Sequence, residues 1–423
     1  MNKINIANQV FDCDHPGLQN ALAVAHKAKT RPACVCRNPA IPMYVAKIAG
    51  AFVVKRMPNS GSTHSSACDH YEPPGELSGL GQLIGSAIQE NPDAGLTAIK
   101  LDFSLKKLGA RTADISSDSQ ADSVKTDGNK LSLRSTLHFL WEEAGFNRWA
   151  PAMNGKRSWY VIRKYLLQAA EDKVAKGAGL IDLIYIPESF STEKKDAISQ
   201  RRIVHMQKAA PPDKGARHLM IAIGEIKEIA QSRYGHKIIF KHLPDFPFMM
   251  NDDIHKRLCK RFEVELGLWD AIETSHLIAI GIFGLAKTGI ATLEEVALMC
   301  VTDNWIPFEG TYDNKLIDAM TRANRRFVKG MRYNLPDSRP LACLVASDTE
   351  PQPTAMYILP PGAASEYANA LTTLTGESSL AHWLWDAADV SLPPLPALGL
   401  RPDLTLPETI GRVESSEESQ LEP

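Results

Sequence analysis

Three observations in the sequence predict a multidomain α+β protein. The chain has 423 residues, which is longer than one compact hydrophobic core usually supports. Hydrophobic residues make up 44% of it and charged residues 23%, so most of the chain should fold into globular structure. Segments with helical spacing and segments with strand-like patterns follow one another irregularly, which favours α+β over a regular βαβ repeat.

Changes in composition divide the chain into five expected parts. The linker is polar and nearly free of large apolar residues, and the tail ends in VESSEESQLEP, so neither can bury enough apolar surface to order. The parts are a small zinc-binding domain (1–108), a flexible linker (109–130), a central basic α/β domain (131–308), a C-terminal α/β domain (309–400) and a disordered acidic tail (401–423).

The N-terminal part is expected to contain a helix and a β-hairpin. Apolar residues recur at helical spacing between His15 and Lys29. Two alternating stretches, Met43–Ile48 and Phe52–Met57, flank the turn sequence Ala49-Gly50-Ala51, which predicts a hairpin. Farther on, the glycines of SGLGQLIG (78–85) predict a helix that packs closely against the zinc module.

After the linker, spacing predicts further helices and strands. The helices are expected at Leu131–Ala144, Trp159–Ala175, Asp252–Trp269 and Asp313–Val328. The strands are expected at Leu219–Ala230, Lys237–Leu243, Leu277–Phe283, Leu341–Ala346 and Ala355–Leu359. The first two helices form a winged-helix-like pair, although the 14 residues between them exceed the turn of a simple helix-turn-helix.

Two short pairs of cysteine and histidine predict a structural zinc site. Cys34 and Cys36 lie in a tight turn, and His64 and Cys68 have the i, i+4 spacing that places both on one face of a helical turn. Structural zinc sites are built from such local pairs, and four protein ligands close the coordination shell. A catalytic zinc would keep one position open for water.

The sequence also allows other interpretations of these cysteines. The three clustered cysteines could simply stay reduced without a metal. Three nearby residues are alternative ligands: Cys13, His15 and His70. The remaining cysteines sit alone in apolar or helical contexts and are expected to be buried thiols in a reducing compartment: Cys259, Cys300 and Cys343.

The sequence gives no sign of export or of membrane insertion. The first residues, MNKINIANQVFDCDHPG, have no sustained apolar segment of the kind found in signal peptides. No run of 18 apolar residues occurs, so no membrane span is expected. A cytoplasmic location is the default expectation.

Several segments together resemble an uncharacterised bacterial family, domain-of-unknown-function family 1173. The N-terminal ones are RPACVC, MYVAKIAGAFVVKRMP, SGSTHSSAC, YEPP and SGLGQLIGSAI, and the later ones are IGEIKEIAQSRYGHKIIFKHLPDFPF and FVKGMRYNLPDSRP. The resemblance implies a plasmid or integrative-element setting and a cysteine site that matches Cys34, Cys36 and Cys68. It implies no activity.

A basic segment in the middle of the chain predicts nucleic-acid binding. Residues 148–241 contain 18 Lys and Arg but only 9 Asp and Glu, whereas the whole chain has a net charge of −2. Such asymmetry is typical of phosphate-binding surfaces. The candidate contacts to DNA or RNA lie around the second helix of the pair: Arg148, Lys156, Arg157, Arg163 and Lys164. An ordinary solvated basic face on two core helices is an equal alternative.

The C-terminal part weakly resembles a restriction-endonuclease-like fold. Such nucleases place a carboxylate on one strand and an acidic-x-Lys pair on the next, where they bind Mg²⁺ and activate water. Asp337 or Asp348 could supply the first carboxylate, but the next strand contains neither an acid nor a base. Lys329 is the last lysine of the chain, so a degenerate, non-cutting copy is expected.

The combined prediction is a zinc-containing, non-catalytic nucleic-acid-binding accessory protein of a mobile genetic element. The alternatives are a metal-dependent nuclease or other hydrolase, and a protein-binding adaptor. Glu225 and Glu228 are read as a solvated strand face rather than as acid–base groups. The histidines between 205 and 255 show no ligand spacing and are read as surface or core residues.

Overall fold

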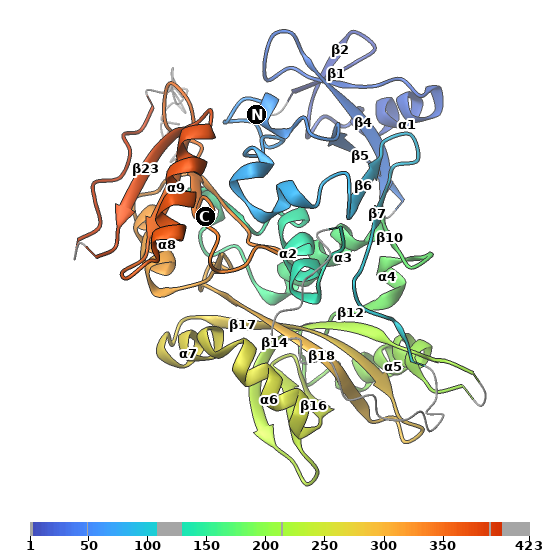
Figure 1. The fold of residues 1–423 in the computed structure, drawn as a ribbon. Helices are drawn as coiled ribbons and strands as arrows, with labels where there is room; N and C mark the ends of the chain where they lie inside the picture. The colour runs from blue at the N-terminus through green and yellow to red at the C-terminus, as the bar shows by residue number, and fades with distance from the viewer. Residues whose placement is uncertain (1–2, 49, 108–128, 213–214, 389–390, 400–423) are drawn as a thin grey trace, which may run out of the picture.

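The computed structural model describes residues 3–48, 50–107, 129–212, 215–388 and 391–399. Sheets and helices are mixed along these residues, which confirms the α+β class (Figure 1). The expected tail at 401–423 lies outside the described residues, as does the expected linker at 109–130 apart from its last two residues. No helix in the described part of the chain is long and apolar enough to cross a membrane.

The first sheet has five strands in the order β2-β1-β3-β4-β5. They are β1 (Lys3–Ile6), β2 (Gln9–Asp12), β3 (Ala33–Cys34), β4 (Ile41–Ile48) and β5 (Ala51–Arg56). The predicted hairpin is confirmed, because β4 and β5 pair antiparallel and Gly50 turns the chain with a φ of +81°. The predicted helix is α1 (Leu18–Ala28), which buries Leu22 and Ala25 against this sheet.

A second sheet joins residues from both sides of the expected linker. Its order is β11-β10-β7-β6, and β7 pairs parallel with β10. The strands are β6 (Ile88–Asn91), β7 (Leu96–Ile99), β10 (Lys173–Ala175) and β11 (Ala178–Gly179). A two-stranded pair, β8 (Lys106–Lys107) with β13 (Arg217–His218), makes another such connection. The expected N-terminal and central domains therefore share sheets.

The predicted helix pair is present as α2 (Leu133–Glu143) and α3 (Trp159–Glu171). Residues 173–175, expected at the end of the second helix, instead form β10. Helix α2 is buried along most of its length, including Leu137 and Trp141. Its N-terminus is capped by Ser132, whose hydroxyl accepts from the Ser135 backbone N–H. Between the helices, β9 (Arg148–Trp149) leaves to pair with a strand of the C-terminal sheet.

The central sheet closes on itself as a five-stranded barrel. Strands pair in the cyclic order β14-β15-β16-β18-β17 and back to β14, with β16–β18 the parallel pair. The strands are β14 (Met220–Gln231), β15 (His236–Phe240), β16 (Leu243–Met250), β17 (His276–Leu285) and β18 (Ala291–Val301). Two short strands extend the sheet, β12 (Ile184–Tyr185) at β14 and β19 (Pro307–Phe308) at β18.

The bend that closes the barrel lies in β14. Its first half pairs with β17 and its second half with β15, and the register shifts between Ile226 and Glu228. A bulge of this kind increases the local twist and bends a strand. Gly224 lies just before it, where a Cβ would come within 2.6 Å of the Phe240 ring. The missing side chain therefore allows the aromatic ring to fill the barrel.

Helices α6 (Asp252–Arg261) and α7 (Glu263–Ala271) connect β16 to β17. They were expected as one helix from Asp252 to Trp269, but Phe262 leaves helical geometry between them and is buried. Helix α4 (Leu180–Leu183) and helix α5 (Lys195–Met206) precede the barrel, and Figure 1 shows α5 beside it. Asn251 caps α6 through its side-chain oxygen, which accepts from the Ile254 backbone N–H.

The C-terminal sheet has the order β23-β22-β21-β20-β9. In sequence its elements are α8 (Thr311–Arg322), β20 (Phe327–Lys329), β21 (Leu344–Ala346), β22 (Thr354–Leu359), α9 (Ser365–Glu377) and β23 (Ala381–Asp386). The first helix was expected to continue to Val328, but Phe327 and Val328 belong to a buried strand. One hydrophobic cluster joins this sheet to the barrel and to α2, while the N-terminal sheet has separate small clusters.

Candidate metal centre and other predicted sites

The four predicted metal ligands come from two loops of the N-terminal sheet. Cys34 ends β3, which lies between β1 and β4, and Cys36 follows in the next turn. His64 follows a short 3₁₀ turn and has extended backbone angles (φ −70°, ψ 157°). A tight turn then brings Cys68 back, because its N–H donates to the Ser65 carbonyl at 2.8 Å. The expectation that His64 and Cys68 share a helical face is therefore wrong, although the loop still brings them together.

The donor atoms of these four residues converge. The Sγ atoms of Cys34 and Cys68 are 3.7 Å apart, and His64 Nδ1 lies 3.4 Å from Cys36 Sγ and 3.8 Å from Cys68 Sγ. All four donor atoms lie within 4.8 Å of one another, so one metal ion can contact all of them. Among the described residues, this cluster contains none of the alternative ligands named above.

Burial disfavours the negatively charged thiolate form of these cysteines unless a cation is present. Cys34 and His64 are fully buried, and Cys68 is nearly so. Burial raises the pKa of the Cys34 and Cys68 thiols, and it lowers the pKa of His64, so the imidazole is neutral. A metal ion needs thiolates and a neutral imidazole, and it supplies the positive charge that the buried thiolates lack. The donor set therefore fits a bound metal ion.

Three of the five predicted nucleic-acid contacts have polar partners inside the fold. Arg148 donates to the Asp69 carbonyl and pairs with Glu72, and Arg163 donates to the Ile186 carbonyl at 3.0 Å. Arg157 donates to four backbone carbonyls, and burial lowers its pKa to about 10. Of the five, Lys156 and Lys164 are exposed.

The two carboxylates considered for a nuclease site have different surroundings. Asp348 is almost fully buried, accepts from the Arg325 guanidinium and also accepts from the Arg326 backbone N–H at 2.6 Å. Asp337 has a side chain that is 90% exposed and lies 3.7 Å from Arg332. Asp348 is thus held in a buried ion pair that links α8, β20 and the loop after β21.

The interpretation of Glu225 as a solvated strand residue is wrong. Glu225 is 4% exposed and accepts from His276 Nδ1 at 2.7 Å and from Lys241 Nζ at 2.9 Å. His276 stacks on Trp305. These partners lie on other strands and loops, far from Glu225 in sequence, so no local spacing signalled the cluster. The carboxylate therefore links β14, beside its bulge, to the start of β17 and to the turn after β15.

The glycine-rich segment SGLGQLIG does not form the expected helix. It contains the short 3₁₀ turn η3 (Gly79–Gln82), which follows another such turn, η2 (Gly75–Leu77). A Cβ at Gly79 would lie 2.0 Å from the Arg332 carbonyl oxygen, and one at Gly81 would meet the Gly75 backbone. The glycines therefore permit close packing against the C-terminal part of the chain and within the segment itself, not against the metal-binding loops.

Comparisons with known proteins agree with the resemblance found in the sequence. Neither a curated protein nor a solved structure matches this chain. A family model with the description "Protein of unknown function (DUF1173)" matches residues 4–388, which is nearly the whole chain. The protein therefore belongs to this family.

Proposed function

We propose that this protein is a zinc-containing, non-catalytic nucleic-acid-binding protein, and that it serves as an accessory protein of a bacterial mobile genetic element. The mobile-element setting rests on the family resemblance. The zinc rests on the Cys/His cluster. The nucleic-acid binding rests on the central barrel and on the surface that its loops present.

The spacing of the donor atoms supports zinc as the metal. With Zn–S bonds of about 2.3 Å and Zn–N bonds of about 2.0–2.1 Å, tetrahedral neighbours lie about 3.5–3.8 Å apart. The separations of 3.7, 3.4 and 3.8 Å in the cluster are close to these values. Three thiolates and one imidazole are a common donor set of closed, structural zinc sites. Zinc would therefore hold the two loops together rather than take part in a reaction.

The observation that carries the nucleic-acid proposal is the strand order of the barrel. A five-stranded barrel in which β14 pairs with both β15 and β17, and β16 runs parallel to β18, has the arrangement of an OB fold. Barrels of this type bind oligonucleotides on the face of their second and third strands, next to the loops 1–2 and 4–5. The corresponding elements are β15, β16 and the loops at 232–235 and 286–290. Because one fold hosts many functions, binding at this surface depends on the side chains at these positions.

The side chains on these two loops suit single-stranded nucleic acid. Tyr234 is 78% exposed, and Arg233 lies over its ring at 5.3 Å. Lys287 and Thr288 are exposed on the other loop. Aromatic rings on which bases stack, beside cations that contact the backbone, are the usual means of binding single strands without sequence preference.

A pocket of about 470 Å³ lies between the second of these loops and helix α5. Phe246 of β16, Arg202 of α5 and Lys287 line it. The Arg202 guanidinium lies 4.6 Å from the centre of the Phe246 ring, and its Nε has no hydrogen-bond partner in the part of the chain that the structure describes. An aromatic ring, a guanidinium and an ammonium group around one pocket can accept a base together with its phosphate.

We expect the triple variant Arg233→Gln, Tyr234→Ala, Lys287→Gln to bind single-stranded DNA or RNA much more weakly than wild type. Loss of one stacking ring costs about 1–3 kcal/mol per base. Loss of two phosphate contacts lowers the log–log salt slope by about 1.4, at about 0.7 per contact on single strands. Fluorescence anisotropy of a labelled oligonucleotide over a salt series measures both effects.

A matched variant separates the barrel from the surface predicted by sequence. Lys156→Gln with Lys164→Gln removes two exposed charges near α3 and leaves the barrel loops unchanged. We expect this variant to bind nearly as wild type does. If the triple barrel variant bound as tightly as wild type and the α3 variant bound more weakly, the interface would lie at the helix pair instead of the barrel. Lack of wild-type binding to single strands, duplex DNA and RNA at low salt would refute the nucleic-acid proposal.

The C-terminal domain supports only the degenerate form of the nuclease alternative. Its elements follow in the order helix, three strands, helix and strand (α8, β20, β21, β22, α9 and β23), which is compatible with the expected restriction-endonuclease-like fold. Strand β22 has the sequence TAMYIL, however, so it supplies no acidic-x-Lys pair. Asp348 is engaged by Arg325 and Arg326. We therefore propose that this domain is structural.

A further inference from the structure

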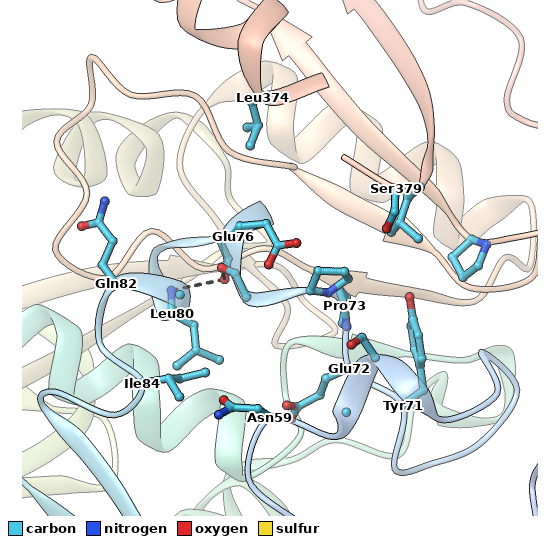
Figure 2. Close-up of a pocket in the computed structure, with 18 of the residues that line it drawn as sticks. Asn59, Tyr71, Glu72, Pro73, Glu76, Leu80, Gln82, Ile84, Leu374 and Ser379 are labelled. Atoms are coloured by element: carbon cyan, nitrogen blue, oxygen red, sulfur yellow. Dashed lines mark hydrogen bonds between the residues drawn. The ribbon is translucent and has the colours of Figure 1, made fainter. Parts of the chain in front are cut away.

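A cleft of about 1540 Å³ opens between the metal-site loop and the C-terminal part of the chain (Figure 2). One wall is the loop that carries His64 and Cys68, represented by Ser62, Ser65 and Ser66. The glycine-rich segment between β5 and β6 forms the floor. Residues 349–353 and the C-terminal half of α9 form the opposite wall. Figure 2 shows Glu72 and Pro73 on one side of the cleft, and Leu374 and Ser379 across from them.

Carboxylates outnumber cations along the cleft. Six glutamates and three arginines line it: Glu72, Glu76, Glu90, Glu143, Glu350 and Glu377, with Arg37, Arg56 and Arg339. Glu72 is neutralised by Arg56 and Arg148, and Glu143 is neutralised by Lys55 and Lys173. The other four glutamates have no ion-pair partner among the described residues, and three of them are exposed. The cleft therefore attracts positive charge and repels phosphates.

Tyr71 provides a second, independent indication of a ligand. Its side chain is 4% exposed, and its hydroxyl has no hydrogen-bond partner among the described residues. Figure 2 shows the ring standing at the cleft with its hydroxyl directed towards the side of Ser379. An unpaired buried hydroxyl costs free energy, because it has lost its bonds to water. A polar ligand atom in the cleft would restore one of them.

The remaining lining is apolar and proline-rich. Leu80, Ile84 and Phe139 lie along the floor, and prolines such as Pro73 and Pro351 lie on the walls. The cleft is larger than the roughly 300–1,000 Å³ of a typical small-molecule site. It therefore has the size for a stretch of polymer, and its lining suits one that carries both apolar and cationic side chains.

We propose that this cleft binds an extended, basic polypeptide segment of a partner protein. Lysine or arginine side chains of the partner would contact Glu76, Glu350 and Glu377, and a backbone group would bond the Tyr71 hydroxyl. This interface is separate from the barrel loops proposed to bind nucleic acid. One chain would thus bind a basic protein and a nucleic acid at different places.

The metal centre contributes to this interface by shaping one of its walls. Ser65 and Ser66 lie between two metal ligands, and Arg37 directly follows a third. The Glu72 N–H donates to the Gly61 carbonyl at 3.1 Å, which ties the start of the floor to the metal-site loop. A metal ion that fixes the loop therefore also fixes the position of Tyr71 and Glu72.

The test is titration of the full-length protein with a fluorescein-labelled peptide of lysines and leucines, at low and moderate salt. We expect the double variant Glu76→Gln, Glu377→Gln to bind it about five- to tenfold more weakly, since each exposed charge pair contributes about 0.2–1 kcal/mol. Tyr71→Phe should weaken binding about fivefold, because one hydrogen bond contributes about 1 kcal/mol. The control Glu193→Gln, Glu273→Gln removes exposed carboxylates elsewhere and should leave the affinity unchanged.

Separate titrations with peptide and with oligonucleotide distinguish this proposal from the nucleic-acid proposal. The cleft variants should bind an oligonucleotide as wild type does, and the triple barrel variant should bind the peptide as wild type does. Weaker oligonucleotide binding by the cleft variants would mean that the cleft binds nucleic acid and would overturn the proposal. Equal affinities of wild type, both cleft variants and the control would also overturn it. Melting temperatures of the variants, expected to be close to that of wild type, confirm that they fold.

Discussion

The Cys68→Ser variant is expected to lose the ordered N-terminal sheet while it retains the barrel and the C-terminal domain. The sheet is held by small apolar clusters, one of which includes Cys34 and Cys68 themselves. In small zinc modules the apparent binding free energy is about 10–16 kcal/mol and acts as folding free energy. Hydrogen exchange should show loss of protection in β3, β4 and the 61–71 loop, with little change in β14 or β17.

A matched cysteine outside the cluster provides the control. Cys259 lies on α6, is half-buried and contacts His255, so Cys259→Ser removes a thiol without touching the metal centre. We expect this variant to keep the wild-type exchange pattern. An N-terminal sheet in Cys68→Ser that exchanges as slowly as in wild type would show that the fold does not depend on the metal.

The Arg325→Met variant is expected to destabilise the C-terminal domain strongly. Arg325 and Asp348 are both nearly inaccessible, and the arginine also donates to the Pro396 carbonyl at 2.6 Å. Removing one partner of a buried ion pair leaves an uncompensated charge and costs about 3–5 kcal/mol. Urea unfolding at neutral pH measures this loss. Methionine keeps much of the apolar stem, so the charge accounts for most of the effect.

Two further variants show whether the effect comes from the charge. Asp348→Asn combined with Arg325→Met removes both charges, and we expect it to recover part of the lost stability. Asp337→Asn changes a carboxylate with a 90% exposed side chain and should have little effect on stability. If Asp348→Asn instead left stability unchanged and abolished a Mg²⁺-dependent nuclease activity of the wild type, Asp348 would be catalytic and our structural reading would be refuted.

The Cys/His cluster could be predicted from the sequence because its residues form two local pairs. One residue lies between Cys34 and Cys36, and three lie between His64 and Cys68, so short loops fix each pair. Only the approach of the two loops depends on the sheet. The helical geometry assumed for the second pair was wrong, since i, i+4 spacing also fits a tight turn after an extended residue.

The barrel could not be predicted in this way because long-range pairings define it. Strand β16 contains Pro244 and Pro247, which weaken its strand pattern, and its parallel partner β18 lies beyond two helices. Closure also depends on the bulge after Ile226 and on Gly224, whose role appears only when Phe240 is placed against it. Periodicity detects single strands but not the order in which they pair.

Net charge along the sequence likewise does not show which charged side chains are exposed and free to bind a ligand. Arg157 lies in the basic segment, but its guanidinium bonds backbone carbonyls. Lys173 is fully buried between Asp172 and Glu143. The exposed cations on which the proposed nucleic-acid binding rests include Lys287, which lies outside the basic segment altogether. The exposure and ion pairing of these side chains depend on the three-dimensional fold, so the sequence alone does not show them.

The most direct test of this account is the metal content of the full-length protein, purified without added metal or chelator. Inductively coupled plasma mass spectrometry should find close to one zinc per chain in wild type and in Cys259→Ser. It should find little zinc in Cys36→Ser and Cys68→Ser. A wild-type protein that contains no zinc and still shows slow hydrogen exchange in its N-terminal sheet would contradict the account.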